Sequence, residues 1–472
     1  MHFINACSVI FSSLLATGSR AWLPGEHHQI LSQDGVNLFS RGSLHQAGLL
    51  TKRYLPNNYG NDKNSIRGIN LGSLFIIENW LANDVFASWG CNSTSEFDCV
   101  SSLHDQDKAN RLFQNHWRSW ITEEDFRQMV SYGLNTVRIP VGYWFLESIV
   151  DDKSEHFAQG GEPYLDRVVG WAKDAGLYVI ISLHGAPGAQ VTDPFTGQLN
   201  SDPGFYHEYN YDRAYRWLEW ITDKIHTNPA YSTVGMLELV NEPERIKSTA
   251  KYPDAWANSH SMRQTYYPTA WSRIRAKEST LNVTSDAQLS IMMMDEKWGS
   301  GDPNQYLPRN PHLAAYDDHA YIKYAGVAEN KDAYLQFSCN YSRSGDSNPI
   351  VVGEWSLSVA TNIESTGNWD PTRDENKDFY RKYWASQVMS YETAAQGWVF
   401  WTWKTTGTLN DPRWDYQKAV AAGIIDTNID NAYSLDICRK ENEDSGSSSR
   451  NGASIMLTFV TAIILVISFC IH

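Results

Sequence analysis

Short apolar runs that end abruptly in polar residues recur along this chain. Residues 234–243 (VGMLELVNEP) are nearly all apolar until Asn241 and Glu242, and a proline follows. A run of this length, rich in Leu, Val and Met, is typical of a strand buried on both faces. Proline lacks an N–H and ends the ladder, so we predict that Asn241 and Glu242 lie where the strand leaves the core. Residues 350–355 (IVVGEW) repeat the pattern and deliver Glu354.

Further runs of the same kind complete a set of eight predicted strands. They lie at residues 66–72, 135–140, 177–183, 289–294, 313–316 and 398–403. Between most of them, apolar residues recur at helical spacing, as in 214–225, and Thr122 to Asp125 carries a helix-capping signal. This alternation predicts an α/β fold, a closed (β/α)₈ TIM barrel, whose active site lies at the carboxyl ends of the strands.

The amino-acid composition indicates which kinds of partner the protein can bind. The chain has 472 residues, 42% of them hydrophobic, and a formal charge of −15 without a basic cluster. We therefore expect no nucleic acid partner. The 19 Trp and 25 Tyr residues exceed the needs of a core, and exposed aromatic rings suit sugar faces.

Both ends of the chain resemble processing signals. Residues 1–21 contain an apolar stretch followed by small residues, which predicts a secretory signal peptide cleaved after Gly18 or Ala21. The catalytic barrel with its lead-in is predicted at 22–438. A Ser/Gly-rich linker at 439–454 precedes the hydrophobic residues 455–472, which together indicate a GPI-anchor signal.

The alternative for the tail is a transmembrane helix, but only His472 follows the apolar segment, which is short for a span. We therefore predict a secreted protein held at the cell surface by a lipid anchor near Ser445 to Ser447, or retained in the cell wall.

Cysteines and glycosylation sequons agree with an oxidising compartment. Cys91 and Cys99 lie close together in one insertion, and we predict that they form one disulfide, with Cys339 and Cys438 forming the other. Sequons predict glycosylation at Asn92, Asn282 and Asn340.

The candidate functional residues gather at the predicted barrel mouth: Arg138, His184, Asn241, Glu242, His319, Tyr321, Glu354 and Trp401. Two carboxyl groups that flank one bond are the apparatus of glycoside hydrolysis, one as acid and one as nucleophile. Arg138 can hold Glu354 ionised, and Asn241 can donate to a sugar hydroxyl. Trp401 offers a flat face to a pyranose ring.

Each of these residues alone has an ordinary structural explanation, such as a surface ion pair or a core histidine. Their co-occurrence at matching strand ends carries the prediction. His184, His319 and Glu354 could form a metal site on paper, but no close-spaced ligand motif supports one, and we expect neither metal nor cofactor.

Six ordered motifs resemble glycoside hydrolase family 5. They are Arg138-Ile139-Pro140, His184 to Gly188, Asn241-Glu242-Pro243, His319-x-Tyr321, Gly353-Glu354-Trp355 and Phe400 to Trp403. The resemblance covers roughly residues 65–438. It implies that Glu242 is the acid/base, that Glu354 is the nucleophile and that the anomeric configuration is retained. It also implies that Glu78 is a sugar-binding carboxylate.

Within that family the chain is most similar to fungal glucan endo-1,6-beta-glucosidases, as in residues 95–100 and 294–303. The resemblance therefore implies an enzyme that hydrolyses cell-wall β-1,6-glucan, and we separately expect a monomer. Two alternatives stay open: an exo-1,3-β-glucosidase of the same family, although residues 191–194 depart from the loop usual there, and a non-catalytic surface glucan-binding protein.

Overall fold

Eight parallel strands close into a barrel in chain order, with the last strand paired to the first. The computed structural model describes residues 65–438 except 310, 312, 344–348 and 436. The predicted signal peptide, linker and anchor signal lie outside these residues. The strands are β1 (Ile66–Asn70), β2 (Thr136–Gly142), β3 (Tyr178–Gly185), β4 (Val234–Glu238), β5 (Ser290–Met294), β6 (Ala314–His319), β7 (Ile350–Trp355) and β8 (Gly397–Phe400). The predicted (β/α)₈ barrel is confirmed.

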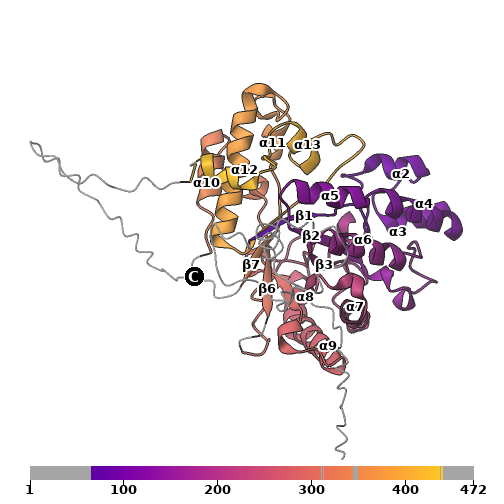
Figure 1. The fold of residues 1–472 in the computed structure, drawn as a ribbon. Helices are drawn as coiled ribbons and strands as arrows, with labels where there is room; N and C mark the ends of the chain where they lie inside the picture. Colours follow the sequence, from indigo (N-terminus) through magenta and orange to yellow (C-terminus); the bar gives the residue numbers. More distant parts are fainter. Residues whose placement is uncertain (1–64, 310, 312, 344–348, 436, 439–472) are drawn as a thin grey trace, which may run out of the picture. The chain divides into compact units, whose positions relative to one another are not determined.

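Helices surround the strands (Figure 1). The β1–β2 connection is the predicted disulfide-bearing insertion. Thr122 caps α5 with the expected reciprocal hydrogen bonds to Asp125. The α-helices are α2 (Asn83–Trp89), α3 (Glu96–Leu103), α4 (Gln106–Ser119), α5 (Glu123–Ser131), α6 (Glu162–Asp174), α7 (Glu208–Thr227), α8 (Ala255–Ser261), α9 (Tyr267–Thr280), α10 (Lys331–Cys339), α11 (Thr361–Glu364), α12 (Asp374–Ala394) and α13 (Tyr416–Ala421).

Several predicted strand bounds were wrong. The strand predicted over 234–243 ends at Glu238, because the chain beyond it changes partner: Leu239 N–H donates to β5 and Asn241 N–H to β3. The strand predicted over 313–316 instead runs to His319. The strand predicted over 398–403 stops at Phe400.

The inside of the barrel is layered. Its apolar layer contains one inward residue from most strands, namely Ile66, Tyr178, Ile180, Met236, Met292, Ala315, Val351 and Val399. Side chains alternate along a strand, so the next inward positions lie two residues further on. Those positions are polar on three strands, at Ser182, Glu238 and Asp317, and on β1 the buried polar residue Asn70 lies four residues beyond Ile66. A buried polar layer therefore lies between the apolar core and the barrel mouth.

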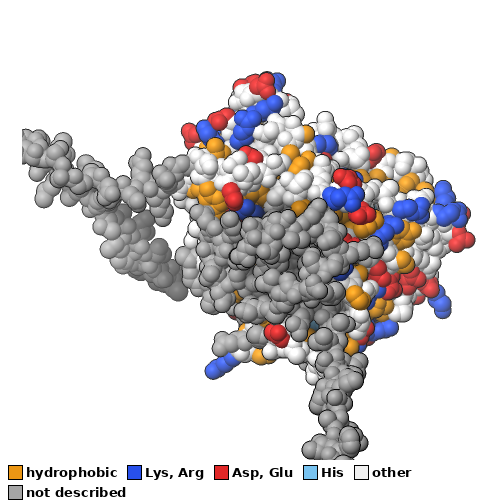
Figure 2. Space-filling model, viewed as in Figure 1, with side chains coloured by type: hydrophobic (Ala, Val, Ile, Leu, Met, Phe, Trp, Pro, Cys, Tyr) orange, Lys and Arg blue, Asp and Glu red, His pale blue; other side chains and the backbone are white. Residues whose placement is uncertain are grey.

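The distribution of charge on the surface agrees with the absence of a basic cluster in the sequence. Acidic and basic side chains are interspersed on the face shown in Figure 2, without a patch of one sign. Among the described residues, no helix is long and apolar enough to cross a membrane.

Candidate active site

Local backbone features aim the two glutamates at each other. Glu242 stands four residues beyond β4 and has φ 39°, an uncommon conformation for a residue other than glycine. On β7, a register shift places Glu354 opposite His319 of β6. Pattern reasoning predicted that both carboxyl groups lie at strand ends, and the structure brings them to the same mouth.

His319 lies between the two glutamates. Its Nδ1 is 2.6 Å from Oε1 of Glu242 and 3.5 Å from Oε2 of Glu354. The ligand-type atoms of these three residues all lie within 4.8 Å of one another. Burial disfavours the imidazolium, but the carboxylates of Glu354 and Asp317 outweigh it and raise the pKa of His319 well above its usual value. A cation therefore separates the two acidic side chains.

Arg138 organises the floor of the site. Its Nη1 donates to Glu354 Oε1 at 2.9 Å and to Asn70 Oδ1 at 3.0 Å. Its Nη2 donates to Glu238 Oε2 and to Asn241 Oδ1, both at 2.7 Å. The guanidinium is fully buried, so its orientation is fixed by these contacts. Because Arg138 holds the oxygen of the Asn241 amide, the Nδ2 group is the donor left for a ligand.

Glu354 is held from both sides. The Tyr321 hydroxyl donates to its Oε2 at 2.8 Å, opposite the Arg138 contact to Oε1. Burial raises the pKa of Glu354, whereas His319, Arg138 and Tyr321 act in the other direction. The prediction that Arg138 favours ionised Glu354 has the right direction, but burial outweighs its effect on the pKa.

Glu78, which the resemblance implies is a sugar-binding carboxylate, is buried within reach of the charges of Glu354 and Glu242. Burial raises its pKa well above the usual range, and the negative charge of Glu354 adds to that effect. Trp80 Nε1 donates to Glu78 Oε2 at 2.9 Å, while the indole is 42% exposed. Trp80 also packs edge-on against Trp414, with ring centroids 5.0 Å apart. An exposed aromatic face thus adjoins the carboxyl groups.

His184 and Trp401 pack against each other. Their rings are stacked, with centroids 5.7 Å apart and planes 8° apart. Burial lowers the pKa of His184 well below its usual value, so it is neutral. Trp401 is only 3% exposed, which leaves little of its indole open to a ligand.

Sequence reasoning missed several residues of the site. Glu238 and Asp317 are polar residues within otherwise apolar strands. Each lies two residues beyond an inward-facing residue, Met236 or Ala315, and this spacing indicates that its side chain also points into the barrel. Trp80 and Trp298 lie in connecting segments whose positions the sequence does not specify. Trp298 packs 5.7 Å from His319, measured between ring centroids.

The side chains whose potential metal-ligating atoms lie close together are not the trio of His184, His319 and Glu354 considered from the sequence. Glu242, His319 and Glu354 bring such atoms together, so Glu242 stands where His184 was considered. The same three side chains are the centre of the acid pair described above.

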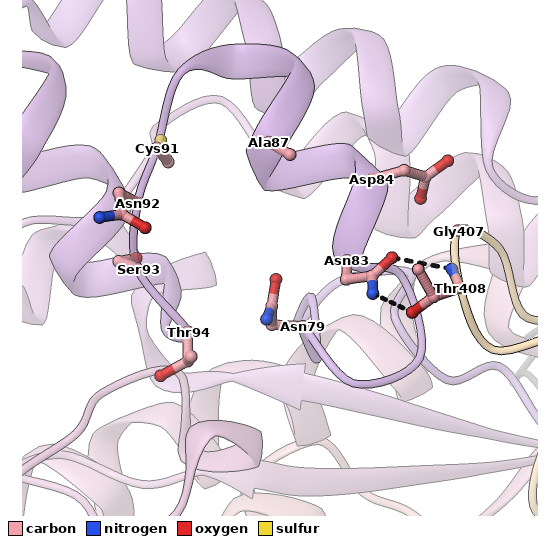
Figure 3. A pocket seen from close by; sticks show the side chains of 10 residues that line it. All are labelled: Asn79, Asn83, Asp84, Ala87, Cys91, Asn92, Ser93, Thr94, Gly407 and Thr408. Carbon is pink, nitrogen blue, oxygen red and sulfur yellow. Dashed lines mark hydrogen bonds between the residues drawn. The ribbon is translucent and has the colours of Figure 1, made fainter.

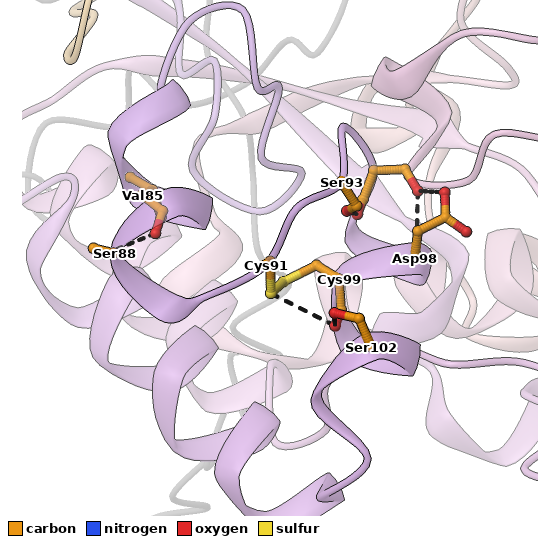
Figure 4. Close-up of a disulfide and its surroundings, with 8 residues drawn as sticks. Val85, Ser88, Cys91, Ser93, Asp98, Cys99 and Ser102 are labelled. Carbon is orange, nitrogen blue, oxygen red and sulfur yellow. Dashed lines mark hydrogen bonds between the residues drawn. A yellow bond between two sulfur atoms is a disulfide. The ribbon is translucent and has the colours of Figure 1, made fainter.

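Both predicted disulfides are confirmed. Cys91 pairs with Cys99 in the β1–β2 insertion (Figure 4), and Cys339 pairs with Cys438; the Cα atoms of each pair lie 5.1 Å apart. The three sequon asparagines are exposed. Asn92 also lines an open hollow of about 510 Å³ together with Asn79, Asn83 and Thr94 (Figure 3).

Comparison with known proteins agrees with this geometry. The family model "Cellulase (glycosyl hydrolase family 5)" matches residues 103–407. The chain belongs to glycosyl hydrolase family 5. Membership makes it a glycosidase, and the family's barrel is the fold described above.

Curated relatives are similar along nearly their whole length. The chain is 49% identical to a probable glucan endo-1,6-beta-glucosidase B of Neosartorya fischeri, over 90% of this chain and 98% of that protein. It is 49% identical to glucan endo-1,6-beta-glucosidase B of Emericella nidulans, over 89% and 96%. Among solved structures, rutinosidase from Aspergillus niger shares the fold, with TM-score 0.58 and 17% identity over 76% of this chain and 98% of that one.

Proposed function

We propose that this family 5 enzyme is an endo-β-1,6-glucanase that hydrolyses cell-wall β-1,6-glucan by double displacement with retention. The observation that supports the mechanism is the proximity of Glu242 and Glu354, whose nearest carboxyl oxygens lie within 4.8 Å. Retaining glycosidases hold their two carboxyl groups roughly 5–5.5 Å apart, whereas inverting ones leave about 6.5–9.5 Å for a water. The printed names of the curated relatives support the linkage.

In the first step Glu354 attacks the anomeric carbon and Glu242 protonates the departing oxygen. The contacts from Arg138 and Tyr321 leave Glu354 one preferred orientation, which favours attack. Esterification of Glu354 removes a negative charge beside Glu242. Having given its proton to the leaving group, Glu242 is a carboxylate and accepts a proton from water in the second step, in which the water oxygen bonds to the anomeric carbon and releases Glu354.

Substrate binding uses the surrounding groups. Asn241 Nδ2 can donate to a sugar hydroxyl, because Arg138 occupies the amide oxygen. Glu78 in its protonated form can donate or accept, and the open face of Trp80 suits a pyranose. We assign Trp401, together with His184, to the wall of the sugar-binding site, since little of the Trp401 ring is exposed.

The first test is digestion of linear β-1,6- and β-1,3-glucans by the secreted ectodomain, with product sizes resolved. A ladder of oligosaccharides from β-1,6-glucan supports the proposal. Release of glucose alone from β-1,3-glucan would move the protein to the exo-1,3-β-glucosidase alternative. Binding without cleavage of either polymer would favour the glucan-binding alternative.

Variants test the residue roles. Glu354→Gln should abolish turnover and leave glucan binding largely intact. Glu242→Ala should slow cleavage of glucan more than that of an activated aryl glycoside, and azide should rescue it as the β-glycosyl azide. Glu244→Gln is the matched control, because its carboxylate binds Asn258 rather than the pair, and it should stay active. An α anomer as first product, seen by proton NMR, would exclude double displacement.

We also propose that the protein is secreted, N-glycosylated at Asn92, Asn282 and Asn340, and monomeric, with a GPI anchor near Ser445 to Ser447. The support for secretion, glycosylation and anchoring is the sequence of the two ends together with the exposed sequons. Phosphatidylinositol-specific phospholipase should release it from intact cells. Retention in cells that lack the anchor transamidase would instead indicate a spanning helix.

A further inference from the structure

Two acidic side chains lie beneath the catalytic pair with no exposed surface. Glu238 of β4 and Asp317 of β6 are each 0% exposed. Arg138 Nη2 is 2.7 Å from Glu238 Oε2 and 3.5 Å from Asp317 Oδ2. The same guanidinium nitrogen therefore contacts both carboxyl groups. Neither takes part in the proposed bond cleavage directly.

The hydrogen bonds of this pair are incomplete if both groups are ionised. Glu238 Oε1 and Asp317 Oδ2 are buried, and among the described residues neither has a hydrogen-bond partner. Ionised carboxylates are acceptors only, so two neighbouring ones cannot satisfy each other. Nearly all buried polar atoms in proteins are hydrogen-bonded, and an unsatisfied one costs about 1–3 kcal/mol. One proton between the two groups would satisfy both oxygens.

The balance of charge leads to the same conclusion. Three buried carboxyl groups, those of Glu238, Asp317 and Glu354, face two cations, Arg138 and His319. With every carboxyl ionised, the interior would hold an excess negative charge, which is costly in a medium of low dielectric constant. With Glu242, which lies 2.6 Å from His319, protonated as the proposed acid, one further proton on Glu238 or Asp317 balances these charges.

The surroundings decide which group holds the proton. Asp317 Oδ1 accepts the Gly353 N–H at 2.9 Å, and its Oδ2 lies 3.4 Å from His319 Nε2. Burial opposes ionisation of Asp317, but His319 and Arg138 outweigh it and lower its pKa. Burial raises the pKa of Glu238 to about 7, against the effect of Arg138.

We propose that Glu238 carries a proton on Oε1 and donates it to Asp317 Oδ2, so that the two groups act as one acid–carboxylate pair that positions the catalytic machinery through Arg138 and His319. The charged and titratable groups that face this pair are Arg138 from β2, Tyr267 from α9, His319 from β6 and Glu354 from β7. Ser182 of β3 adds a neutral hydroxyl.

The proton matters because Arg138 contacts both the pair and Glu354. While Glu238 is neutral, the positive charge of Arg138 is shared with fewer carboxylates and favours ionised Glu354. As pH rises through about 7, loss of the Glu238 proton adds a negative charge at the floor of the site. We therefore expect kcat/KM to fall at alkaline pH for a reason other than loss of the Glu242 proton.

Glu238→Gln tests this directly, because the amide can donate to Asp317 and accept from Arg138 at any pH. The measurement is kcat/KM against pH for an activated aryl glycoside, whose departure does not need Glu242 as acid. We expect the variant to stay active and its alkaline limb to weaken or move to higher pH. Glu96→Gln is the matched control: Glu96 is buried and binds only Ile77 N–H among the described residues, so its limb should match wild type.

Asp317→Asn distinguishes the two carboxyl groups. It removes the negative charge that lies 3.4 Å from His319 Nε2, so we expect a much larger loss of kcat than for Glu238→Gln. Equal losses in the two variants, or a Glu238→Gln alkaline limb identical to wild type, would overturn the assignment.

Infrared difference spectra give a readout without activity. In a Glu242→Gln/Glu354→Gln background at pH 6, adding Glu238→Gln should remove one band of a protonated carboxyl group. The proton placement does not depend on the proposed function, whereas the activity readout does. Persistence of that band would refute the proposal and leave the glucanase assignment standing.

Discussion

Tyr321→Phe is the sharpest test of how the site prepares Glu354. The change removes one hydroxyl, which donates to Glu354 Oε2 at 2.8 Å. The ring keeps its packing against Trp414 and His319, at centroid distances of 5.6 and 6.5 Å. Burial, with the nearby charges of Glu354 and Glu242, raises the pKa of Tyr321 well above its usual value, so the hydroxyl is a donor throughout the working range.

The magnitude follows from the type of bond lost. A hydrogen bond to an ionised group contributes about 1.5–3 kcal/mol. The hydroxyl lowers the pKa of Glu354, because it stabilises the carboxylate and not the protonated acid. Without it, Glu354 keeps its proton to higher pH. With about 1.4 kcal/mol per pH unit, the acidic limb of kcat/KM should move upward by roughly one to two pH units.

The assay is kcat/KM for an aryl glycoside from acidic to neutral pH. Activity should fall most at low pH, where protonated Glu354 cannot attack, and least on the plateau. Tyr231→Phe is the matched control: Tyr231 is fully buried and donates to Asp166 Oδ1 at 2.7 Å, but it precedes β4 at the opposite end of the barrel. Its profile should match wild type.

An acidic limb that stays in place in Tyr321→Phe would refute the reasoning, because the hydroxyl would then contribute nothing to the ionisation of Glu354. A uniform loss at all pH values, accompanied by a lower melting temperature, would show a packing role instead.

Three further predictions follow from contacts outside this bond. Trp80→Ala should raise KM for glucan about tenfold, the size of one aromatic contact, with little change in kcat for an aryl glycoside; equal effects on both substrates would contradict a binding role. Cys339→Ser with Cys438→Ser opens a loop of sequence separation 99 and should lower the free energy of unfolding by up to about 4–5 kcal/mol, measured by urea denaturation. An unchanged midpoint would show no contribution. Gly353→Ala places a Cβ 2.0 Å from Asp317 Oδ1, so we expect a loss of about 1–3 kcal/mol in thermal denaturation and a lower kcat; wild-type behaviour would contradict this packing.

The sequence by itself determined the barrel and the positions of the two glutamates that we propose as catalytic. Each strand is a short buried run, and the carboxyl ends of parallel strands share one edge, so Glu242 and Glu354 had to meet there. The disulfide partners also followed from the sequence, since Cys91 and Cys99 share one insertion and only Cys339 and Cys438 then remain outside the predicted signal segments.

Tertiary structure alone decided which side chains touch. Periodicity tells which face of a strand a residue occupies, but the register between strands decides its neighbours. The shift on β7 sets Glu354 opposite His319, and the turn after β4 gives Glu242 its positive φ. Glu238 and Asp317 lie 79 positions apart in the chain and meet only because the barrel closes around Arg138. Their shared burial, which makes a proton necessary, is a property of that closure and of no local segment.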